Sequence, residues 1–98
     1  MNSFSEILKQ EKPVLVDFYA EWCGPCKALA PVLESVKNEL KDTAIIIKID
    51  VDKNQTLASK LNVRGVPTLV IYKNGEIVWR QSGVLSKDEI TGKIRMYV

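Results

Sequence analysis

The chain has 98 residues, of which 46% are hydrophobic, and its 14 basic and 12 acidic side chains leave a net charge of +2. This composition is typical of one folded domain, which we expect to span residues 1–98, and it argues against a disordered chain or a nucleic-acid partner. Because the sequence has no histidine and two cysteines, it excludes His-based triads, and a zinc site would need carboxylate ligands or a second subunit.

The N-terminal segment carries no basic stretch followed by an apolar run, which is the pattern of a secretory signal. No apolar run approaches the roughly 20 residues that span a bilayer. We therefore expect no membrane partner and a cytoplasmic location.

The first predicted element is a short helix that stops before Pro13. Ser3 followed by Glu6 is a capping box, and an apolar stripe follows on Phe4, Ile7 and Leu8. Residues 14–19 form a nearly continuous apolar run interrupted only by Asp17, which is typical of a central strand covered on both faces.

A long helix and a second strand follow. The segment from Cys23 to about Leu40 has apolar residues at helical spacing, namely Leu29, Val32, Leu33, Val36 and Leu40. Residues 44–51 contain another apolar run, which we interpret as a second buried strand. A strand, a crossover helix and a strand form a right-handed βαβ unit, so the two strands should be parallel.

The next segments predict a short helix and a hairpin. Asn54 can cap the helix, whose apolar positions are Leu57, Ala58 and Leu61. Beyond Pro67, residues 68–73 and 76–81 flank Asn74-Gly75, the dipeptide that best suits a two-residue type I′ turn. These two segments should therefore pair as antiparallel strands.

A final helix should open at Ser86, which forms a second capping box with Glu89, and should bury Ile90 and Ile94. The element order is then αβαβαββα. This order predicts an α/β fold with a central mixed four-stranded sheet flanked by four helices.

The motif Cys23-Gly24-Pro25-Cys26 lies where the first strand has ended and the long helix begins. A helix N-terminus presents unpaired N–H groups and the positive end of the helix dipole, which favour a thiolate, and the thiolate is the nucleophile. Cys23 should be exposed just outside the helix and Cys26 shielded in its first turn, with Gly24 and Pro25 shaping the turn. A CxxC pair in a βαβ context indicates a redox motif; the alternatives are two unrelated buried thiols or half of a metal site.

The segment VDFYAEWCGPCKALAP resembles the active-site segment of the thioredoxin family, and the similarity continues through Lys48, Arg64-Gly65-Val66-Pro67-Thr68, Lys73-Asn74-Gly75 and Gly83. It covers the chain from Val14 onward. The chain departs from the family pattern at Tyr19, where many members have tryptophan, and at Ser82, which replaces an apolar residue. The resemblance implies a thioredoxin fold, and the late start of the chain leads us to expect that the family's usual first β-strand is missing.

Asp17 and Lys48 each interrupt one of the two predicted parallel strands. Burial raises the pKa of a carboxyl group, and a nearby ammonium partly offsets that rise. Without histidine, Asp17 is the candidate to accept and return the proton of Cys26, directly or through a water. The alternative is an ordinary salt bridge or a solvent-facing residue, whereas the resemblance implies that both side chains lie beneath the disulfide.

The resemblance also implies an apolar surface on which protein substrates dock, formed by Trp22, Gly24, Pro25, Gly65, Val66, Pro67 and Gly83. It implies further that the peptide bond before Pro67 is cis and lies against the cysteines. The backbone of Val66 could then pair with an extended substrate segment. The alternatives are that Trp22 packs on its own loop and that Pro67 is an ordinary trans turn proline.

The function that follows is that of a thiol–disulfide oxidoreductase that reduces disulfides in target proteins. Cys23 would attack a substrate sulfur, and Cys26, activated by Asp17, would resolve the mixed disulfide and leave Cys23 and Cys26 oxidised. We expect no bound cofactor or metal, an NADPH- or ferredoxin-linked thioredoxin reductase as electron donor, and a monomer. The alternatives are a disulfide oxidant or isomerase of the same fold, and a non-catalytic docking or shared-metal module.

Overall fold

The computed structural model describes residues 3–98, so the first two residues of the predicted 1–98 domain lie outside it. A single turn of 3-10 helix joins the long helix to the second strand, and the predicted order of the other elements is confirmed. The elements are α1 (Phe4–Leu8), β1 (Val14–Tyr19), α2 (Gly24–Leu40), η1 (Lys41–Thr43), β2 (Ile45–Asp50), α3 (Gln55–Lys60), β3 (Thr68–Lys73), β4 (Glu76–Ser82) and α4 (Lys87–Arg95).

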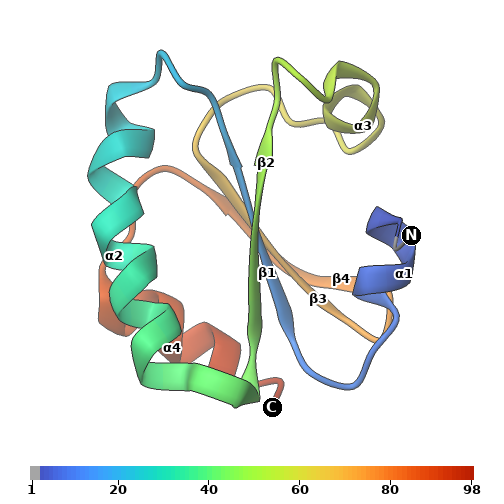
Figure 1. The fold of residues 1–98 in the computed structure, drawn as a ribbon, viewed down its shortest axis with the longest axis vertical. Helices are drawn as coiled ribbons and strands as arrows, with labels where there is room; N and C mark the ends of the chain where they lie inside the picture. Colours follow the sequence, from blue (N-terminus) through green and yellow to red (C-terminus); the bar gives the residue numbers. More distant parts are fainter. Residues whose placement is uncertain (1–2) are drawn as a thin grey trace.

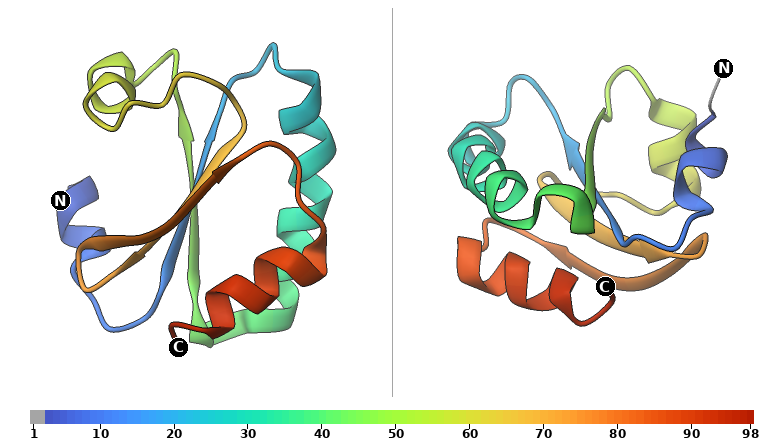
Figure 2. Two further views of the ribbon diagram at one scale, coloured as in Figure 1. Left: turned by 180° about the vertical axis from the view of Figure 1, so that it is seen from behind. Right: turned by 60° about the horizontal axis from the view of Figure 1, so that its bottom comes forward.

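The four strands form one sheet in the order β2-β1-β3-β4, in which β1 and β2 are parallel and the other two pairs are antiparallel. The predicted mixed sheet is therefore confirmed, and within residues 3–98 no strand precedes β1. Helices α2 and α4 lie on one side of the sheet, and α1 and α3 on the other (Figure 1). The view from behind shows α4 crossing the sheet beside α2 (Figure 2).

Strand β1 is the centre of the core, as predicted. Because side chains alternate along a strand, Leu15 packs with residues of α2 and α4, whereas Val14, Val16 and Phe18 pack toward α1 and α3. All four of these side chains are fully buried. Asp17 shares the face of Leu15, so its carboxyl group lies on the side of the sheet that α2 covers.

The prediction that the second strand is buried is wrong. Strand β2 is at the edge of the sheet, where only β1 pairs with it, so its isoleucines are half-buried and Lys48 is exposed. The apolar run gave no information about position in the sheet, because an edge strand that packs on both faces shows the same pattern as a central one.

The turn and cap predictions hold in part. Asn74 and Gly75 have φ values of 53° and 84°, as a type I′ turn requires, and the capping box of Ser86 and Glu89 is complete. Ser3 caps α1 by accepting the Glu6 N–H, whereas the Glu6 carboxylate receives the Ser3 hydroxyl. At the start of α3, the Asn54 amide donates to the Asp50 carbonyl at 2.9 Å and makes no hydrogen bond that caps the helix.

Candidate active site

The two cysteines lie together at the start of α2, at one end of the sheet. Cys23 is the N-cap of the helix, and a disulfide joins it to Cys26 with the Cα atoms 5.2 Å apart. The Cys26 backbone N–H donates to the Cys23 sulfur over 3.1 Å. One of the unpaired N–H groups of the helix thus points at the sulfur that was predicted to become the thiolate.

The predicted exposure of Cys23 is wrong. Only 3% of the residue is accessible to solvent, compared with 5% of Cys26. The position outside the helix is as expected, but Ala20 and the half-buried Val66 pack around the disulfide. The Val66 carbonyl oxygen lies 3.7 Å from the Cys23 sulfur. Burial of Cys23 is therefore a tertiary effect that the local position at a helix end does not reveal.

Asp17 is fully buried, and neither of its carboxylate oxygens has a hydrogen-bond partner among residues 3–98. Burial raises the pKa of Asp17 to about 6, and the positive charge of Lys48 partly offsets this rise. Asp17 and Lys48 are directly paired in the register of β1 and β2. The carboxyl group is therefore neither a solvent-facing residue nor part of a salt bridge, and it titrates close to neutral pH.

Lys48 lies at the outer edge of this arrangement. Its ammonium nitrogen is 5.3 Å from the centre of the Tyr19 ring, a cation–π contact. Both side chains line a cavity of about 250 Å³ whose wall also includes Cys26 and Lys27. The cavity connects the edge of the sheet with the second cysteine, on the face that holds Asp17.

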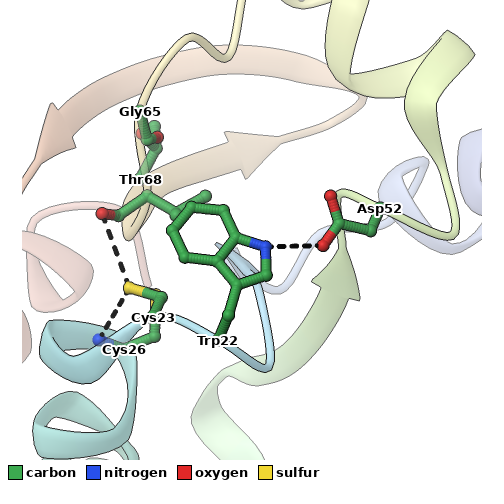
Figure 3. Close-up of a disulfide and its surroundings, with 7 residues drawn as sticks. Trp22, Cys23, Cys26, Asp52, Gly65 and Thr68 are labelled. Carbon is green, nitrogen blue, oxygen red and sulfur yellow. Dashed lines mark hydrogen bonds between the residues drawn. A yellow bond between two sulfur atoms is a disulfide. The ribbon is translucent and has the colours of Figure 1, made fainter.

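Trp22 is 71% exposed, and its indole N–H donates to the Asp52 carboxylate over 2.8 Å. Figure 3 shows the ring beside the disulfide and turned toward Asp52. The loop after β2 thus fixes the orientation of the ring while its surface remains open. Sequence reasoning missed Asp52, because no pattern links a carboxylate to an indole 30 residues away.

The segment between α3 and β3 completes the site. The Val66–Pro67 peptide bond is cis, and Gly83 donates its N–H to the Pro67 carbonyl over 2.9 Å. Val66 and Gly65 line a hollow of about 110 Å³ together with Trp22. The structure therefore gathers Trp22, Gly65 and Val66 around one hollow and packs Val66 against the disulfide.

Within residues 3–98, no helix is long and apolar enough to cross a bilayer. The same residues contain no group of three or more His, Cys, Asp or Glu side chains placed to hold a metal ion.

The sequence model of the thioredoxin family matches residues 1–96. A thioredoxin from Buchnera aphidicola is 46% identical over 92 residues, which cover 94% of this chain and 84% of that one. A thioredoxin from Acidithiobacillus ferridurans is 44% identical over 87 residues, covering 89% and 81% of the two chains.

Among solved structures, a mutant thioredoxin from Halobacterium salinarum superposes with a TM-score of 0.87 at 44% identity, over 95% of this chain and 80% of that one. The agreement therefore extends over both sequence and fold. On this evidence the chain belongs to the thioredoxin family, whose members are thiol–disulfide oxidoreductases.

Proposed function

We propose that this chain reduces disulfides in target proteins with Cys23 as the attacking thiolate and Cys26 as the resolving thiol. The observation that carries this assignment is the Cys26 N–H donating to the Cys23 sulfur at the N-cap of α2. A sulfur that receives an N–H at the positive end of a helix dipole is stabilised as a thiolate.

The reaction transfers two electrons in two exchange steps. The Cys23 thiolate attacks one sulfur of a substrate disulfide, so that a Cys23–substrate bond forms and the other substrate sulfur leaves as a thiolate. Cys26 then attacks the Cys23 sulfur, which releases the second substrate thiolate and leaves the Cys23–Cys26 disulfide. The substrate is reduced to a dithiol, and the dithiol of this protein is oxidised.

Asp17 is the group that we assign to proton transfer. Cys26 must lose its proton before it attacks, and a carboxyl group with a pKa of about 6 can accept a proton and return it near neutral pH. The cavity lined by Cys26 and Lys48 has room for a water beside the Cys26 thiol. Lys48 would adjust the pKa of Asp17 through its charge, with no direct contact to substrate.

The docking surface consists of Trp22, Gly65, Val66, Pro67 and Gly83, with Gly24 and Pro25 shaping the adjoining turn. Among residues 3–98, no acceptor receives the backbone N–H of Val66, and the Cys23 sulfur is the one polar contact of its carbonyl. Since a strand residue exchanges both groups with its partner, an extended substrate segment can pair here without regard to its sequence.

The electron donor follows from the family. A thioredoxin reductase must return the Cys23–Cys26 disulfide to the dithiol, and we propose an NADPH- or ferredoxin-linked enzyme. A dithiol that acts as a reductant is maintained in a reducing compartment, which supports a cytoplasmic location. Both cysteines, Asp17 and the docking surface belong to one chain, so the proposed unit of function is a monomer.

A trapping experiment tests the assignment of the two cysteines. Cys26→Ser should accumulate a covalent mixed disulfide with a protein substrate, because the attacking sulfur remains and the resolving sulfur is gone. Cys23→Ser should accumulate none. Continued turnover of Cys26→Ser without a trapped complex would show that the roles are wrong.

A second assay identifies the direction and source of the electrons. Reduction of insulin is followed first with dithiothreitol and then with NADPH- and ferredoxin-linked reductases in turn. Activity with dithiothreitol and with one reductase is the expected result. Activity with dithiothreitol alone would still support reduction of target disulfides by this protein, and it would rule out the tested reductases as its electron donors.

A further inference from the structure

Two hydroxyl groups lie behind the segment that faces the disulfide. Thr68, at the first position of β3, is 1% exposed, and its hydroxyl oxygen is 2.6 Å from the Gly65 carbonyl oxygen. The Ser82 hydroxyl, at the end of β4, is 3.0 Å from the same Thr68 oxygen. Figure 3 shows Gly65 and Thr68 above the cysteine pair.

The directions of these two hydrogen bonds follow from the chemistry of the groups. A carbonyl oxygen only accepts, so the Thr68 hydroxyl must donate to Gly65. Its single proton is then used, and the Ser82 hydroxyl must be the donor to Thr68. The hydrogen bonds therefore run in one direction, from Ser82 through Thr68 to the Gly65 carbonyl.

This chain of hydrogen bonds determines where the Val66 N–H points. The Gly65–Val66 peptide is trans, since the cis bond in this segment is the next one. In a planar trans peptide the carbonyl of one residue and the N–H of the next point in opposite directions. Because the Gly65 carbonyl is directed inward at buried Thr68, the Val66 N–H is directed outward.

Among residues 3–98, the Thr68 hydroxyl is the hydrogen-bond donor to the Gly65 carbonyl, and a Cβ atom at position 65 would meet no atom within 4 Å. The Val66 side chain packs against the disulfide, so it holds the residue after this peptide and makes no hydrogen bond to the Gly65 carbonyl. The ends of the segment are held separately: Gly83 N–H donates to the Pro67 carbonyl over 2.9 Å, and Arg80 donates to the carbonyls of Leu61 and Asn62. Loss of the Thr68 hydroxyl would thus free one peptide plane within a segment that stays attached at both ends.

We propose that Ser82 and Thr68 are positioning residues for substrate binding, which hold the Gly65–Val66 peptide so that the Val66 N–H faces the substrate backbone. This proposal rests on the strand-like docking described above. Neither hydroxyl hydrogen-bonds to a sulfur, so both act on the binding of extended substrates and leave the exchange chemistry unchanged.

The first test separates binding from chemistry. Thr68→Val keeps the shape of the side chain and removes its hydroxyl, and we expect it to raise KM for a disulfide-linked peptide about fivefold, the effect of losing one neutral hydrogen bond. The value of kcat, and the rate with the small aromatic disulfide 5,5′-dithiobis(2-nitrobenzoate), should stay within about twofold of the wild type. Ser82→Ala, at an exposed position, should change KM in the same direction by less.

Thr91→Val is the matched control, because Thr91 is also buried and donates its hydroxyl to a backbone carbonyl, that of Asp88, but lies in α4. Urea unfolding of each variant confirms that it is folded at the assay temperature. An equal rise of KM in Thr68→Val and Thr91→Val would overturn the proposal, as would an unchanged KM in Thr68→Val.

The second test uses the substrate backbone. In a set of disulfide-linked peptides, each residue near the reacting cysteine is replaced in turn by the corresponding hydroxy acid, which removes the N–H of that residue and weakens the carbonyl acceptor of the residue before it. With the wild type, two adjacent esters should raise KM: one removes the N–H that donates to the Val66 carbonyl, and the next weakens the carbonyl that accepts from the Val66 N–H, by about fivefold. With Thr68→Val the penalty of the second of these esters should fall toward one, because the Val66 N–H no longer faces that carbonyl.

The outcomes of the second test are distinct. If no ester raises KM of the wild type, the proposal of strand-like docking is wrong, and the positioning role of Thr68 and Ser82 is wrong with it. If the wild type discriminates and Thr68→Val retains the full ester penalty, docking stands and the hydroxyl pair does not orient the peptide.

Discussion

Charged side chains are paired at one end of α2 and unpaired at the other. At its C-terminal end, where α2 meets α4, Glu39 pairs with Lys87 at 2.9 Å and with Arg95 at 2.8 Å. At its N-terminal end, fully buried Asp17 lies under the helix without a partner among residues 3–98. A buried polar group without a partner lowers the stability of the fold. The paired charges at the C-terminal end of α2 therefore favour stability, whereas the N-terminal end holds the group proposed for proton transfer at a cost in stability.

The largest expected effect comes from removing the charge at the N-terminal end. The pKa of Asp17 is raised from 3.8 to about 6, so the folded state binds this proton more tightly than the unfolded chain does. The ionised carboxylate therefore destabilises the fold above pH 6, by about 3 kcal/mol. Asp17→Asn should raise the free energy of unfolding by up to that amount at about pH 8, and the gain should disappear as the pH falls below the unfolded value.

Urea unfolding of the oxidised protein across this pH range measures the effect, with exposed Asp42→Asn as the matched control. The same Asp17→Asn variant should reduce a protein disulfide several-fold more slowly near neutral pH. A variant that gains stability but keeps the wild-type rate would show that Asp17 takes no part in the mechanism, while confirming that burial of its charge destabilises the fold.

Lys48→Met should have the next largest effect, on the same carboxyl group. The positive charge of Lys48 lowers the pKa of Asp17, so its removal should raise that pKa further and reduce the free energy of unfolding at neutral pH. The pH at which the reduction rate changes should rise together with the pKa of Asp17. Exposed Lys53→Met is the control; an identical pH profile for the two variants would contradict this coupling.

At the other end of the molecule, Gly92→Ala should stabilise the protein. Gly92 lies inside α4, and an added methyl group would meet no atom within 4 Å. Alanine is favoured over glycine in a helix by about 0.5–1 kcal/mol, which thermal unfolding can resolve. The rate of disulfide reduction should not change, and a reduced rate would show that the two ends are coupled.

The smallest effect is expected at Glu39. The neighbouring Lys87 and Arg95 lower the pKa of this carboxyl, so the ion pairs contribute stability above its unfolded value and lose it as the pH falls through the folded one. Glu39→Gln should lower the melting temperature slightly at neutral pH and low salt. The difference should vanish in high salt, because exposed charges are screened. Glu34→Gln, also exposed on α2, provides the control.

The sequence determined the elements and much of the chemistry of this protein by local rules. Asn74-Gly75 fixed the hairpin because its two residues accept positive φ, and Ser86 with Glu89 fixed the start of α4. The CxxC spacing placed both sulfurs at a helix N-terminus. The βαβ unit made the strands that carry Asp17 and Lys48 parallel neighbours, since the crossover dictates the direction of the second strand.

Only the tertiary structure decided the features that depend on residues distant in the chain. The edge position of β2 follows from strand order, which an apolar run does not encode. Cys23 is buried because Val66, 43 residues later, packs on it. The orientation of Trp22 depends on Asp52, and that of the Gly65–Val66 peptide on Thr68 and Ser82. Local sequence sets which groups are present, whereas packing sets which of them are covered, paired or left open.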